Sequence, residues 1–130
     1  MNRARVWPPF VTAALLVLVG TLQAGTLSNE VDGVRVELSS SPTRPGAKGE
    51  TEYLVRLVDR AGQPITGAHV TLRGGMADGM SVVTPLRAAE QAGVYRGRVL
   101  FTMEGTWELT LRVARDGKRF ELPLTERVGR

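Results

Sequence analysis

The sequence predicts an all-β protein, an antiparallel sandwich of about seven strands that follows one N-terminal hydrophobic helix. Three observations lead to this prediction. Apolar and polar side chains alternate along several short segments, as expected of strands with one buried and one solvent-facing side. Turn-forming residues separate these segments, and the chain holds 15 glycines and 7 prolines. Beyond the N-terminus, no stretch has a long helical period.

The N-terminal segment has the pattern of a secretory signal. Arg3 and Arg5 precede an uncharged run whose apolar centre, residues 10–22, reads FVTAALLVLVGTL. A basic start followed by about 7–15 apolar residues is typical of such signals. Small residues follow at Ala24 and Gly25, so cleavage after Ala24 is possible, although Leu22 is larger than the residue preferred there.

A retained membrane anchor is the alternative interpretation of this segment. Residues 6–25 reach the roughly 20 mostly apolar residues that a membrane span needs. A buried core helix of a cytosolic protein is the remaining possibility. We therefore expect residues 1–24 to be a signal peptide or anchor and residues 25–130 to form one exported domain. That domain would lie in the periplasm or at the extracytoplasmic face of the cytoplasmic membrane.

Charge and cysteine content exclude several classes of function. The whole chain has a net charge of +4; without Arg3 and Arg5, 15 basic and 13 acidic residues remain, a balance of +2. The basic residues are scattered and do not cluster with aromatics, which argues against nucleic-acid binding. The chain has no cysteine, so it can form neither a disulfide framework nor a thiolate metal site.

The strands of the exported domain follow from alternation. In the first, Val34, Val36 and Leu38 alternate with polar residues. The second, residues 52–59, carries apolar side chains on both faces, which is typical of a central strand. The remaining strands are predicted at residues 68–73, 81–86, 93–101, 107–113 and 120–124.

The clearest block spans residues 93–113, GVYRGRVLFTMEGTWELTLRV. Its alternation predicts two paired strands joined by a tight turn, with Tyr95 and Trp107 in the core. Opposite charges across a strand pair are favourable, so we expect Arg98 to face Glu108, with Gly105 free to take a positive φ. Asp116-Gly117 predicts a two-residue hairpin turn into the last strand. Such spacing of short strands predicts an immunoglobulin-like sandwich.

Three sequence elements carry a resemblance to a known family. They are DRAGQPITGAHVTL, the methionine-bearing loop GGMADGM and the block at residues 93–113. In this order they resemble the YtkA-like family of small exported β-sandwich domains, and FixH-like proteins are similar in plan. The resemblance implies an immunoglobulin-like sandwich outside the cytoplasmic membrane. It also implies a link to copper handling or to cytochrome oxidase assembly, because several relatives have one.

This implied link directs attention to Met76, Met80 and His69 as candidate metal ligands. Thioether and imidazole groups suit Cu(I), and the two methionines lie four residues apart in a glycine-rich loop. The competing interpretation is structural: methionines fill irregular gaps in cores, and His69 falls on the outward face of its strand. Asp59 and Asp78 are interpreted as turn residues.

The residues present do not predict an enzyme. A lone histidine without a local motif makes a Ser/His/Asp set unconvincing, and the acidic residues are spread singly. We therefore expect a non-enzymatic interaction or accessory module, exported or membrane-tethered, that assists a membrane or respiratory complex and has no cofactor. Its partners would be the membrane, through an uncleaved N-terminal segment, and a protein of that complex. The alternative is a periplasmic copper-binding carrier.

Overall fold

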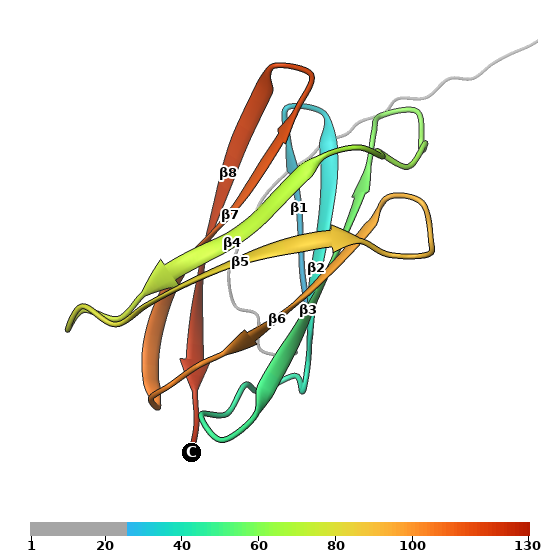
Figure 1. The fold of residues 1–130 in the computed structure, drawn as a ribbon. Helices are drawn as coiled ribbons and strands as arrows, with labels where there is room; N and C mark the ends of the chain where they lie inside the picture. Colours follow the sequence, from blue (N-terminus) through green and yellow to red (C-terminus); the bar gives the residue numbers. More distant parts are fainter. Residues whose placement is uncertain (1–25) are drawn as a thin grey trace, which may run out of the picture.

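The computed structural model describes residues 26–130, and the predicted signal or anchor, residues 1–24, lies outside this part (Figure 1). The described residues form eight strands and no helix, so no helix among them could span a membrane. The all-β antiparallel prediction is confirmed, with one strand more than expected. The strands are β1 (Thr26–Val31), β2 (Val34–Ser41), β3 (Glu50–Val58), β4 (His69–Gly75), β5 (Ser81–Ala88), β6 (Val94–Leu100), β7 (Gly105–Arg115) and β8 (Lys118–Val128).

The strands are hydrogen-bonded in the order β1-β2-β3-β6-β5-β4-β7-β8. This sheet folds over on itself, so that β1, β2, β3 and β6 face β4, β7 and β8 as two layers (Figure 1). Strand β5 joins the layers, because it pairs along most of its length with β4 and then with β6 at Arg87 and Ala88. Gly97 allows this crossing: a Cβ there would lie 3.0 Å from the carbonyl oxygen of Pro85.

The additional strand, β1, forms a hairpin with β2 that the sequence prediction missed. Asp32 and Gly33 connect the two strands with φ angles of 52° and 80°. Asp116 and Gly117, which connect β7 and β8, have φ angles of 53° and 76°. Positive φ at both central residues is the signature of a tight hairpin turn whose twist matches the strands. The prediction of a turn at Asp116-Gly117 is therefore confirmed, and the same dipeptide signal marks β1.

The predicted pairing within residues 93–113 is wrong. Strand β6 pairs with β3 and β5, whereas β7 pairs with β4 and β8, so the connection between β6 and β7 crosses from one layer to the other. Arg98 therefore does not face Glu108; its cross-strand partner is Glu52, and it forms an ion pair with Glu50 at 3.7 Å. Gly105 does have a positive φ, of 134°, as expected.

The hydrophobic core lies between the two layers and takes one face of each of the strands that contribute to it. The alternation predicted these faces correctly: Tyr95 is 2% exposed and Trp107 is fully buried. Tyr53, Val55 and Leu57 of the central strand β3 are buried as well. The buried hydrophobic side chains of the two layers form one contiguous core cluster.

Candidate functional site

The predicted site residues lie at the two ends of the sandwich. One end is formed by the β2–β3 loop, the β4–β5 turn and the β6–β7 loop, and we call it the methionine end. The opposite end carries the hairpin turns at Asp32-Gly33 and Asp116-Gly117, and we call it the turn end. In Figure 1 the methionine end lies toward the bottom and left of the molecule and the turn end toward the top.

The structure brings Met76 and Met80 together at the methionine end. They flank the turn between β4 and β5, where the amide of Met76 donates to the carbonyl oxygen of Met80 at 2.8 Å. The Oδ1 atom of Asp78 accepts a hydrogen bond from the amide of Met80 at 3.2 Å. Asp78 is therefore a turn residue, as predicted. Both methionine side chains are half-buried against the core.

The β6–β7 loop adds a third methionine to this end, which the predicted ligand set did not contain. The indole Nε1 of Trp107 donates to the carbonyl oxygen of Met103 at 3.0 Å and holds the loop in place. The terminal methyl of Met76 lies against Gly105, where an added Cβ would come within 2.5 Å of it. Because Gly105 lies two residues after Met103, the β4–β5 turn and the β6–β7 loop meet at this point.

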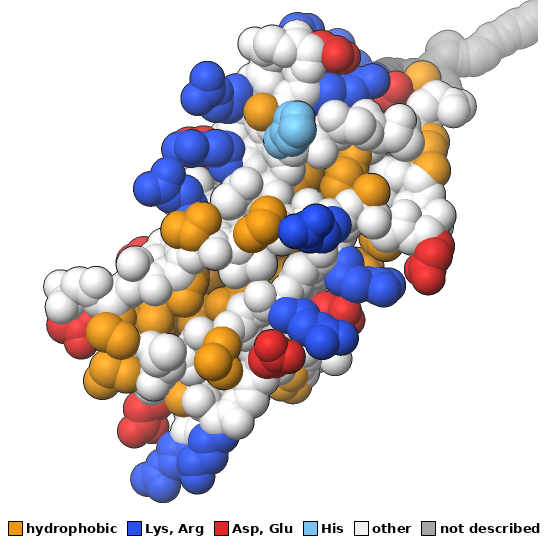
Figure 2. Space-filling view, in the orientation of Figure 1, with side chains coloured by type: hydrophobic (Ala, Val, Ile, Leu, Met, Phe, Trp, Pro, Cys, Tyr) orange, Lys and Arg blue, Asp and Glu red, His pale blue; other side chains and the backbone are white. Residues whose placement is uncertain are grey.

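His69 does not join the methionines. It is the first residue of β4, whereas Met76 directly follows the last residue of that strand. Six residue steps of extended chain separate the two ends of β4 by about 20 Å. His69 is exposed toward the turn end, where Figure 2 shows it as the pale blue side chain. The structure thus places Met76 and Met80 on one turn and His69 at the other end of β4.

A buried polar contact links the two layers near the methionine end. The phenol of Tyr53 donates to Oε2 of Glu126 at 2.7 Å. Burial raises the pKa of the Tyr53 phenol, and the adjacent Glu126 carboxylate raises it further. Burial also raises the pKa of Glu126, although the hydrogen bond from Tyr53 opposes this effect. The sequence held a signal for this contact, because Glu126 is in phase with the inward-facing Leu122 and Leu124 of β8.

The chemistry at the methionine end is that of thioethers and apolar surface. Leu100 and Met103 are 53% and 43% exposed, and Val83 of β5 is 67% exposed. Figure 2 shows hydrophobic side chains at the surface around the β4–β5 turn. Within the part of the chain that the structure describes, no three His, Asp or Glu side chains gather as metal ligands. This end can therefore offer thioethers to a soft ion or an apolar surface to a partner.

Comparisons with known proteins agree with this architecture. A crystal structure of a DUF4426 family protein from Pseudomonas aeruginosa superimposes with a TM-score of 0.59, covering 81% of this chain and 95% of that one. The two sequences are 14% identical, so this similarity shows the fold alone. No curated protein gives a significant match. The family model described as YtkA-like matches residues 28–112, from β1 into β7, and the chain therefore belongs to the YtkA-like family.

Proposed function

We propose that this chain is a non-enzymatic interaction module, exported or membrane-tethered, that contacts a membrane protein complex through its methionine end. The observation that carries this proposal is the exposure of Leu100 and Met103 at this end, 53% and 43%. Leu100 and Met103 lie three residues apart in the chain, and exposed apolar groups that gather in one patch are typical of interaction surfaces. The backbone that presents them is held by the bond between Trp107 and Met103, so little ordering is needed on binding.

The direction of β1 gives this surface an orientation. The first residue of β1, Thr26, pairs with Ser39, which lies near the end of β2 that leads into the methionine end. The chain thus enters the sandwich at this end. An anchor within residues 1–24 would turn the methionine end toward the membrane and toward a partner embedded in it. This orientation supports a membrane complex as the partner in preference to a diffusing protein.

The proposal is tested by the size of the assembly that contains the full-length chain in its native membranes. On native gels we expect the wild-type chain in a large complex and the Leu100→Ser/Met103→Ser variant largely outside it. His69→Ser, at the opposite end, is the control and should leave the complex intact. A wild-type chain that runs alone, or a double variant that stays in the complex, would reject the proposal.

Fractionation separates the two forms of this proposal. A chain that begins at residue 25 and is wholly released into the soluble fraction would reject the tethered form and leave the exported one. A chain that keeps residues 1–24 and stays with the membrane fraction would support the tethered form.

The second candidate function is a copper carrier, which the position of Met76 and Met80 on one short turn favours. Two thioethers from one turn, with Met103 on the adjacent loop, are soft donors suited to Cu(I). Titration with Cu(I) under reducing conditions tests this. We expect the Met76→Ala/Met80→Ala variant to lose affinity and His69→Ala to keep it, because His69 lies at the far end of β4. Binding weaker than about micromolar, or equal affinity in the double variant, would reject this function.

A further inference from the structure

The turn end of the sandwich contains an open pocket of about 170 Å³. It lies between the β1–β2 turn, the β3–β4 loop and the β7–β8 turn, far from the methionine end. Its apolar walls combine core residues with two half-buried side chains, Val34 and Phe120. The fully apolar wall residues are Val34, Leu57, Ile65, Val113 and Phe120.

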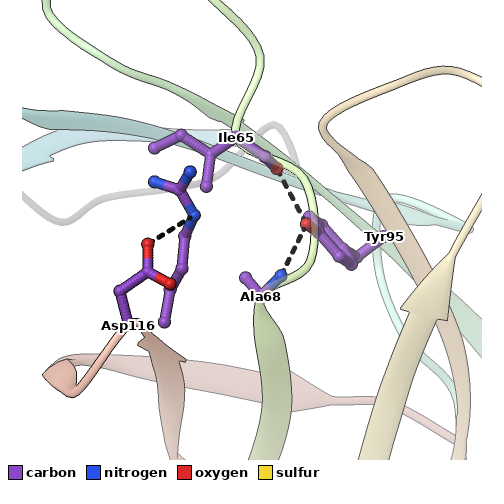
Figure 3. Close-up of polar contacts among 5 residues, drawn as sticks. Ile65, Ala68, Tyr95 and Asp116 are labelled. Atoms are coloured by element: carbon purple, nitrogen blue, oxygen red, sulfur yellow. Dashed lines mark hydrogen bonds and ion pairs between the residues drawn. The ribbon is translucent and has the colours of Figure 1, made fainter.

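One wall of this pocket is held rigidly by Tyr95. Its hydroxyl donates to the carbonyl oxygen of Ile65 at 2.7 Å and accepts from the amide of Ala68 at 3.1 Å. Figure 3 shows these two bonds joining Tyr95 of β6 to Ile65 and Ala68 of the β3–β4 loop. Because the loop is fixed before any ligand arrives, binding would require little ordering of the wall.

The rim of the pocket is polar and carries three basic and two acidic side chains. Arg115, Lys118 and Arg119 contribute positive charge, and Asp32 and Asp116 contribute negative charge. Arg115 forms an ion pair with Asp116 at 3.5 Å, which is drawn in Figure 3. Lys118 and Arg119 form no ion pair with any residue of the described chain. Among the described residues, Lys118 and Arg119 thus lie beside the apolar hollow without an ion-pair partner, as does one carboxylate, Asp32.

We propose that this turn-end pocket binds a small organic carboxylate whose apolar body is about the size of a benzene ring. A cavity of about 150 Å³ lined by apolar side chains holds benzene, so the volume here suits one ring or a short branched chain. The body would rest on Val34 and Phe120, and the carboxylate would face Lys118 and Arg119. A neutral ligand would form no ion pair with those cations.

The test uses phenylacetate as the probe and phenylacetamide as its uncharged counterpart. Each compound is titrated into the ¹⁵N-labelled protein, which is purified in the form that the cell produces. Backbone amide chemical shifts are followed by NMR. For phenylacetate we expect saturable shifts at Val34, Ile65 and Lys118 with a dissociation constant of about 1 mM, reasonable for so few atoms. Phenylacetamide should bind about fivefold more weakly, because exposed charge pairs contribute modestly.

Variants of strand β8 separate this site from general attraction to a basic surface. Lys118→Gln/Arg119→Gln should weaken phenylacetate binding about fivefold. Arg127→Gln removes an exposed arginine at the other end of the same strand and should leave the dissociation constant for phenylacetate unchanged. The proposal is overturned if phenylacetate gives no saturable shifts, if the amide binds equally well, or if the double variant binds like the wild type. Because the pocket and the methionine end lie at opposite ends of the sandwich, a negative result for phenylacetate binding would not bear on the proposed interaction surface.

Discussion

Replacement of Trp107 probes how the methionine end is attached to the core. The indole is fully buried, packs edge-to-face on Phe101 with ring centroids 5.1 Å apart, and donates to the carbonyl oxygen of Met103. Trp107→Ala should lower the free energy of unfolding by about 3–5 kcal/mol, the usual cost of truncating a buried aromatic. A domain of this size has about 5–15 kcal/mol in total, so the variant loses a large share of its stability.

Trp107→Phe separates core packing from the hydrogen bond. It keeps an aromatic ring against Phe101 but removes the donor to Met103, and we expect a loss of about 1–3 kcal/mol. Guanidinium unfolding followed by far-UV circular dichroism measures both variants and does not depend on the fluorescence of the replaced residue. A free energy for Trp107→Ala within about 1 kcal/mol of the wild type would refute the assignment of Trp107 as a core anchor.

Three further predictions follow from single contacts. Burial raises the pKa of Glu126, so the carboxylate form is disfavoured in the fold and the contribution of Glu126 to stability falls as pH rises above the unfolded pKa. The melting temperature of Glu126→Gln should therefore rise relative to that of the wild type as pH increases. A difference in melting temperature that does not depend on pH would contradict this. Tyr95→Phe removes both hydroxyl bonds and should cost about 1–3 kcal/mol and speed amide hydrogen exchange at Ala68, whereas unchanged exchange would show that the hydroxyl does not hold the loop. Gly97→Ala should cost about 1–3 kcal/mol in denaturant unfolding because its Cβ approaches Pro85, while Gly49→Ala, with open space around it, is the control and should be nearly neutral.

The sequence predicted which face of each strand is buried, because alternation is a local property of the chain. It did not predict that β6 and β7 lie in different layers, because alternation says nothing about the partner of a strand. The expected pairing of Arg98 with Glu108 followed from charge alone. In the structure Glu50 and Glu52 on β3 are the negatively charged neighbours of Arg98. Strand β1 was missed because its first residues, 26–29, continue the uncharged run that begins after Arg5 and show no clear alternation.

The spatial arrangement of the three candidate ligands could be predicted only in part, because sequence spacing is a local property of the chain. Met76 and Met80 are close in sequence and close in space, because a tight turn connects β4 and β5. His69 is nearly as close to Met76 in sequence, but an extended strand separates them over its whole length. The approach of Met76 to Gly105 depends on how two connections from different parts of the chain meet, which no local pattern encodes.

Site-specific photo-cross-linking in native membranes tests the central claim, that the methionine end is the surface that contacts a partner. A photoreactive residue would replace Leu100 in one full-length chain and His69 in another, since both positions are exposed and lie at opposite ends of the sandwich. We expect a discrete adduct with a membrane protein from position 100 and none from position 69. An adduct from position 69 alone, or no adduct from position 100, would contradict it.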